Sequence, residues 1–117
     1  MQFCPWYPLA AAAEHAPASP GIYQVRVEHG RLLEYPRGKS AMVHYGHAVD
    51  LRAAALALAA QHRNRGWLCR HALLGPDDLD PRERALGPER IFADLVAAFA
   101  RRFGVPPTFP ESLPSAD

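Results

Sequence analysis

The stretch from His44 to Ala60, HYGHAVDLRAAALALAA, places the strongest constraint on how this 117-residue chain can fold. Alanine has the highest helix propensity, so the pattern predicts a helix from about Leu51 to Arg63, with Asp50 as its N-cap. The helix has little polar surface before Gln61, which indicates burial on more than one side. Such a helix has to pack against other secondary structure.

Three other segments have the composition of β-strands. They are residues 22–27, rich in β-branched and aromatic residues, residues 41–46, which end at Gly46, and residues 66–74. Gly30 marks a turn after the first strand. Residues 32–35 then pair back as a short strand, and residues 36–40 form an exposed loop.

Helices are expected at both ends of the chain. Pro8 can begin a short helix over residues 8–15, and Pro81 can begin a helical turn in the loop after the last strand. From Glu89 to Phe103 the apolar residues recur at helical spacing, and Gly104 supplies a C-terminal cap. The order strand, strand, helix, strand, helix predicts an α+β fold.

The predicted architecture is a small, mostly antiparallel three-stranded sheet flanked by helices. We expect a single domain over residues 1–104, followed by a proline-rich arm or tail over residues 105–117. Nearly half of the residues are hydrophobic, at 49%, which suffices for one core in a domain of this size.

Charge and cysteine content limit the possible environments. The net charge is +1, so the composition does not indicate a general nucleic-acid or membrane binder, although a local basic face is possible. Cys4 and Cys69 occur without a secretory signal, which favours reduced thiols and a cytoplasmic location. The apolar run in residues 51–60 is far shorter than the ~20 residues of a membrane span, so no membrane partner is expected.

Two motifs resemble those of the GIY-YIG nuclease family. PGIYQVRV at residues 20–27 is similar to the first motif, and VHYGHAVDLR at residues 43–52 is similar to the second. RRFGVPPTF at residues 101–109 is similar to the end of small stand-alone bacterial members. The resemblance covers most of the chain and implies metal-dependent hydrolysis of DNA phosphodiesters. In the family a tyrosine helps to activate water, an arginine stabilises the phosphate charge and a glutamate holds the metal.

The match is good in the first motif and poor elsewhere. Gly21, Ile22 and Tyr23 match the first motif, and in the second motif His44 replaces the tyrosine, Tyr45 replaces the isoleucine and Gly46 matches. By the family pattern, Ala54 stands at the arginine, Phe92 at the metal-binding glutamate and Phe109 at the closing asparagine. Loss of one oxyanion-stabilising donor commonly costs about 10²–10³ in rate. We therefore expect a catalytically impaired domain that binds nucleic acid or protein and needs no cofactor.

An active enzyme is the alternative hypothesis. It would use Tyr23, His44 and Arg52 as catalytic residues and Asp94 as a metal ligand for Mg²⁺ or Mn²⁺. Candidate phosphate-binding residues under either hypothesis are Gly46, His47, Arg52 and Arg63. His44 and His47 would lie on opposite faces of a strand, which disfavours them as a metal pair.

Basic and aromatic residues leave the choice of partner open. The basic set that could form a phosphate-facing patch, or be solvated helix ends, is Arg37, Lys39, Arg63, Arg65, Arg70, Arg101 and Arg102. Trp6, Tyr7 and Trp67 could stack on bases or belong to the core, and Trp6 is expected to fold onto the sheet. A third hypothesis is a protein-interaction module, unrelated to nucleic acid, that binds through the alanine-rich helix.

Overall fold

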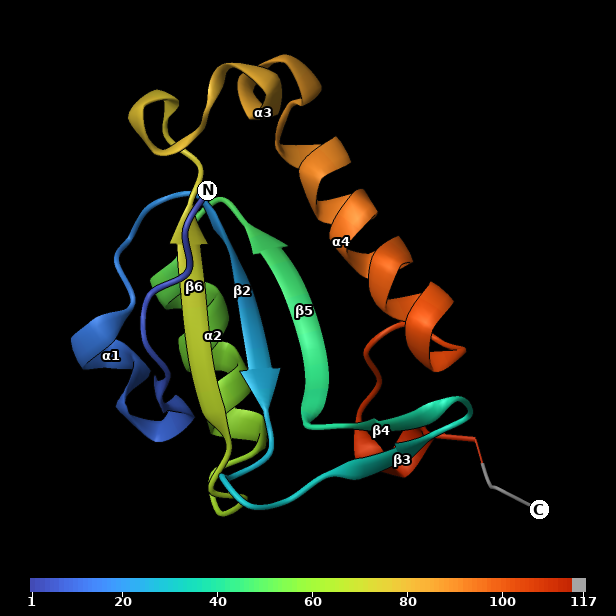
Figure 1. Cartoon of the computed structure of the whole chain (residues 1–117). Helices are drawn as coiled ribbons and strands as arrows, with labels where there is room; N and C mark the ends of the chain where they lie inside the picture. Colours follow the sequence, from blue (N-terminus) through green and yellow to red (C-terminus); the bar gives the residue numbers. More distant parts are fainter. Residues whose placement is uncertain (115–117) are drawn as a thin grey trace.

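The fold is built on a four-stranded antiparallel sheet in the order β1-β6-β2-β5 (Figure 1). The structure, a computed structural model, describes residues 1–114, so the last three residues of the predicted arm lie outside the described part. The strands of this sheet are β1 (Tyr7–Pro8), β2 (Gly21–Arg26), β5 (Met42–Ala48) and β6 (Leu68–Leu73). The α+β class and the mostly antiparallel sheet are confirmed.

The expectation of three strands is wrong in one detail. The short strand β1 pairs with β6, with Tyr7 opposite Cys69 and Pro8 opposite Leu68. The sequence placed Pro8 at the start of a helix, but proline is also tolerated on an edge strand, where its missing N–H is not needed. The helical part begins one residue later, with η1 (Leu9–Ala11) and α1 (Ala12–His15).

A second correction concerns residues 33–40. β3 (Leu33–Tyr35) and β4 (Gly38–Ser40) pair with each other as a separate hairpin, instead of a strand pairing back on β2 and an exposed loop. Tyr35 draws this hairpin toward α4 (Pro88–Phe103), because its ring contacts Phe99 and Phe103 at centroid distances of 5.1 and 5.7 Å. Such contacts between distant segments leave no local pattern in the sequence.

The central strand β2 separates two hydrophobic clusters. Tyr23 and Val25 face α2 (Leu51–Gln61) and belong to the cluster around Leu51, whereas Ile22 faces the opposite side with Ile91 of α4. Figure 1 shows α2 behind the sheet and α4 alongside β5. α2 is buried on one face only, with Leu56 still 43% exposed, because its alanines favour the helix without requiring burial.

The helix ends follow the predicted capping. The Asp50 carboxylate accepts a hydrogen bond from the Ala53 N–H at 3.0 Å, and α4 ends at Gly104 with a φ of +96°. These two predictions are confirmed. In the described part of the chain, no helix is long and apolar enough to cross a membrane.

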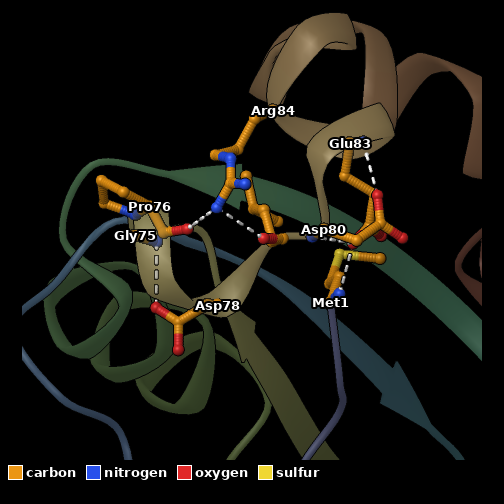
Figure 2. Close-up of polar contacts among 8 residues, drawn as sticks. Met1, Gly75, Pro76, Asp78, Asp80, Glu83 and Arg84 are labelled. Carbon is orange, nitrogen blue, oxygen red and sulfur yellow. Dashed lines mark hydrogen bonds and ion pairs between the residues drawn. The ribbon is translucent and has the colours of Figure 1, made fainter.

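A polar network fixes the connection between β6 and α4 (Figure 2). Arg84 of α3 (Pro81–Leu86) donates to the carbonyl oxygen of Pro76 in η2 (Pro76–Asp78) at 3.0 Å. The Met1 ammonium lies 2.6 Å from the Glu83 carboxylate. These contacts tie the start of the chain and α3 to the same end of the sheet.

Candidate functional site

The first and second motifs meet at Tyr23, on the sheet face that α2 covers. Tyr23 pairs with Gly46, and its ring lies directly over this glycine, where a Cβ atom would collide with the ring. The Tyr23 hydroxyl lies 3.4 Å from Nε2 of His44 on β5. The resemblance placed these residues in a catalytic groove, and the structure brings all three together.

One aromatic ring of the C-terminal segment, that of Phe109, packs at this position. Phe109 stacks on His44, with ring centroids 5.1 Å apart and ring planes 12° from parallel. The same ring stacks on His62, at 5.1 Å, and on Trp67, at 5.9 Å. Phe109 therefore covers the ring of His44, the residue whose Nε2 atom faces the Tyr23 hydroxyl.

Burial determines the charge state of this pair. It raises the pKa of Tyr23, with a smaller contribution from Cys69, and it lowers the pKa of His44, with a smaller contribution from His62. At neutral pH the phenol is thus protonated and the imidazole is neutral. The arrangement lets Tyr23 donate a hydrogen bond to His44, which is unsuited to a tyrosine that must take a proton from water.

The other candidate catalytic residues lie elsewhere. Nε of Arg52 donates to the carbonyl oxygen of Ala16 at 2.8 Å, so this side chain anchors the segment after α1. Asp94 is exposed on α4 and forms an ion pair with Arg90 at 2.9 Å. The structure does not bring Arg52 or Asp94 to Tyr23.

The remaining candidate phosphate-binding residues also lie apart from one another. Gly46 is covered by the Tyr23 ring. His47 points to the opposite sheet face from His44, as the strand alternation predicted, and lies 5.9 Å from the Phe92 ring of α4. Arg63 is exposed beyond the end of α2, where it lines a cavity of about 400 Å³ together with Leu56.

Apolar packing is found where the resemblance expects polar groups. Ala54 packs against the cluster under α2, and Phe92 packs against the cluster under α4. Residues 1–114 contain no group of three or more His, Cys, Asp or Glu side chains placed to hold a metal ion. Ala54 and Phe92 thus make hydrophobic contacts at the two positions where the resemblance would require charged groups.

A cluster of arginine and aromatic side chains lies on the opposite face of the sheet. The guanidinium carbon of Arg70 lies 4.5 Å from the centre of the Trp6 ring and 4.7 Å from that of Phe3. Arg26 approaches the same Trp6 ring at 5.7 Å. We call these four residues the arginine–aromatic face.

A buried glutamine orients this face. Gln24 is 3% exposed, and its Oε1 accepts a hydrogen bond from Nε of Arg70 at 2.8 Å. Burial lowers the pKa of Arg70, but an arginine remains charged at neutral pH. Arg70 and Trp6 were each expected from the sequence as candidate contact residues, whereas Phe3, Arg26 and Gln24 were not. The sequence pattern that could have indicated this face is the pair Gln24 and Arg26, at alternate positions of an otherwise apolar strand.

No family model, curated protein or solved structure matches the chain.

Proposed function

We propose that this protein is a non-cleaving, GIY-YIG-like domain that binds single-stranded nucleic acid through the arginine–aromatic face. The observation that carries the proposal is the layering of Arg70 and Arg26 against Trp6 and Phe3. Aromatic rings stack on unpaired bases, and arginines beside them attract the phosphate backbone. A net charge near neutrality is compatible with this, because the basic groups act locally.

The absence of cleavage follows from the placement of three apolar residues. Ala54, Phe92 and Phe109 stand where the resemblance expects an arginine, a glutamate and an asparagine, and all three contact hydrophobic or aromatic neighbours. Phosphodiester hydrolysis needs positive charge where the transition state gains negative charge. Retained catalysis would require Arg52 or Asp94 to lie beside Tyr23. Arg52 instead donates to the Ala16 carbonyl oxygen, and Asp94 pairs with Arg90.

Titration of fluorescent oligonucleotides at several salt concentrations tests the binding. We expect single strands to bind more tightly than duplexes, and Trp6→Ala to cost about 1–3 kcal/mol, the usual contribution of one stacked base. Arg70→Met should reduce the slope of log K against log salt by about 0.7, the contribution of one phosphate of a single strand. Arg90→Met, on exposed α4, is the matched control and should change neither quantity.

The same preparation tests cleavage. Incubation of single-stranded, duplex and branched DNA with Mg²⁺ or Mn²⁺ should leave every substrate intact. Cleavage that is lost in Tyr23→Phe would overturn the non-cleaving proposal and support the divalent-metal endonuclease. Affinity that does not respond to salt would count against phosphate contacts.

A protein partner is the second candidate function. It is favoured by the exposed apolar side chains Val49, at 86% exposure, and Leu56, at 43%, which lie just before α2 and on it. If no nucleic acid binds, Leu56→Glu tests this candidate through the oligomeric state measured by sedimentation. A shift from dimer to monomer in the variant would support association through α2, and a monomeric wild type would exclude self-association.

A further inference from the structure

Cys4 is held beside His71 by the backbone of both residues. The Cys4 N–H donates to the His71 carbonyl oxygen at 2.9 Å, and the His71 N–H donates to the Cys4 sulfur at 3.4 Å. The same sulfur lies 3.6 Å from Nδ1 of the His71 ring. The thiol is thereby fixed next to an imidazole nitrogen on β6, in the strand beside Tyr23, which is the cross-strand partner of His71.

Tyr7 completes the cluster. Its hydroxyl lies 2.9 Å from the same Nδ1 atom, and its ring stacks on His15 with centroids 4.7 Å apart. Burial raises the pKa of Tyr7, so the hydroxyl stays protonated and donates to Nδ1. Burial, and to a lesser extent His15, lowers the pKa of His71, so the ring is neutral at neutral pH. The lone pair of Nδ1 accepts the Tyr7 hydrogen bond at rest, so the hydroxyl has to turn away before Nδ1 takes the proton of the neighbouring thiol.

Two cavities open on either side of Cys4 and His71. One has a volume of about 460 Å³ and is also lined by Phe3 and Asp77. The other, of about 360 Å³, is also lined by Tyr7. Both volumes fall in the range of small-molecule sites. The titratable groups around His71 are Cys4, Tyr7, His15, Tyr23, Cys69, Asp77 and Asp78.

The second thiol differs from the first. Cys69 is fully buried, whereas Cys4 is partly exposed and lines both cavities. Burial raises the pKa of Cys69 to about 11. The chain therefore contains a shielded thiol that serves as an internal reference for the accessible one.

We propose that Cys4 is a covalent addition site for small, uncharged α,β-unsaturated carbonyl compounds, with His71 as the proton acceptor. The Cys4 S–H bond breaks and its proton moves to Nδ1 of His71, while sulfur forms a bond to the β-carbon. The π electrons of the alkene move to the carbonyl oxygen as an enolate, to which the Tyr7 hydroxyl can donate. The imidazolium then returns the proton to the α-carbon. The net reaction adds S–H across the double bond and needs no oxidant or reductant.

This site does not depend on nucleic-acid binding or on Tyr23. Acrylamide is the smallest suitable probe, and mass spectrometry of the reacted, reduced full chain locates the adduct. We expect modification of Cys4 well ahead of Cys69, unchanged kinetics in Cys69→Ser, and loss of the fast adduct in Cys4→Ser. Equal rates at both thiols, or faster modification of Cys69, would overturn the proposal.

The role of His71 is separated from mere positioning by the pH profile of the addition rate. If neutral His71 takes the thiol proton, the wild-type rate should stay nearly constant from about pH 6.5 to pH 8, because the reaction does not wait for a free thiolate. His71→Asn should be slower by about tenfold or more at the low end, and its rate should rise about tenfold per pH unit with the thiolate fraction.

The outcome does not depend on the folding of the variant. If thermal unfolding shows that His71→Asn is not folded, the wild-type profile alone decides: a rise of about tenfold per pH unit across the same interval would exclude His71 as the proton acceptor. Tyr7→Phe removes the competing donor to Nδ1 and leaves the ring in place. Because the same hydroxyl is the proposed donor to the enolate, the rate at Cys4 should fall, but its pH profile from about pH 6.5 to pH 8 should stay flat while His71 takes the proton. A rise of about tenfold per pH unit in Tyr7→Phe would assign the effect of His71→Asn to packing.

Discussion

The ring of Phe109 stacks on that of His44, with ring planes 12° from parallel and centroids 5.1 Å apart, and His44 in turn lies beside the Tyr23 hydroxyl. A hydrogen bond from the Thr108 N–H to the Tyr35 hydroxyl, 3.1 Å long, holds the same segment on the β3–β4 hairpin. An ion pair between Arg65 and Glu111 joins it to the loop after α2. The C-terminal segment is thus attached by one partly buried ring and by polar contacts.

Replacement of this ring should destabilise the whole fold. Phe109→Ala removes contacts with His44, His62 and Trp67, so we expect a loss of about 3 kcal/mol in the free energy of unfolding, the lower end for buried Phe→Ala changes because the ring is only partly buried. Urea unfolding at neutral pH measures the loss.

The matched control lies two residues away. Glu111→Gln removes the charge of the exposed ion pair and should change the midpoint of unfolding little, because surface ion pairs contribute little to stability. If both variants lose the same free energy, the attachment of the segment is electrostatic and the ring is not its main anchor.

The parts of the fold that could be predicted are those encoded locally. The helix after Asp50, the helix ending at Gly104 and the three long strands each follow from a run of adjacent residues. The β3–β4 hairpin and the edge strand β1 could not be predicted, because they depend on contacts with residues far along the chain. Tyr35, for example, is held by Phe99 and Phe103 of α4.

In the candidate site, too, local features could be predicted and contacts between distant segments could not. Alternation along a strand predicted that His44 and His47 lie on opposite faces. The pairing of Tyr23 with Gly46 was not predicted, because it depends on the register between β2 and β5. The carbonyl oxygen that holds Arg52 and the ring that covers His44 come from other segments, so no spacing near either residue indicated them. The arginine–aromatic face likewise joins the N-terminal segment to β2 and β6.

Gly46 should tolerate no side chain. A Cβ atom at this position would overlap the ring of Tyr23, which is itself buried against the α2 cluster. We expect Gly46→Ala to cost about 1–3 kcal/mol or more, as for overpacked cores. Urea unfolding of Gly46→Ala, Tyr23→Ala and the double variant measures the coupling. A cost that is fully additive in the double variant would show that the ring is not the obstacle.

The N-cap of α2 should contribute measurably to stability. Asp50 accepts a hydrogen bond from Ala53, so Asp50→Ala is expected to lose about 1 kcal/mol in thermal or urea unfolding. Asp94→Ala is a suitable comparison, because this carboxylate only pairs with Arg90 on the exposed face of α4 and should contribute about 0.3–0.5 kcal/mol. An equal loss in both variants would contradict a specific capping role.

Stability should fall as the pH decreases through the ordinary range of histidine titration. Burial lowers the pKa of His44 and of His71 in the folded protein, so folding favours their neutral forms. Their contribution is complete above about pH 6.5, where the unfolded histidines are also neutral, and is lost progressively as the pH falls toward the folded-state pKa values. Carboxylates such as Glu83, whose pKa is lowered by its hydrogen bond with the Met1 ammonium, add to the loss only at lower pH.

The test compares the free energy of unfolding at about pH 7.5 and pH 5.5, both above the carboxylate range. His44→Asn should show a smaller decrease between the two pH values than the wild type, whatever its stability at the higher pH. His29→Asn is the matched control, because His29 is exposed in the turn after β2 and should keep the wild-type decrease. If His44→Asn shows the same pH dependence as the wild type, the stacked imidazole does not resist protonation, and its ring contact with Phe109 survives the addition of a charge.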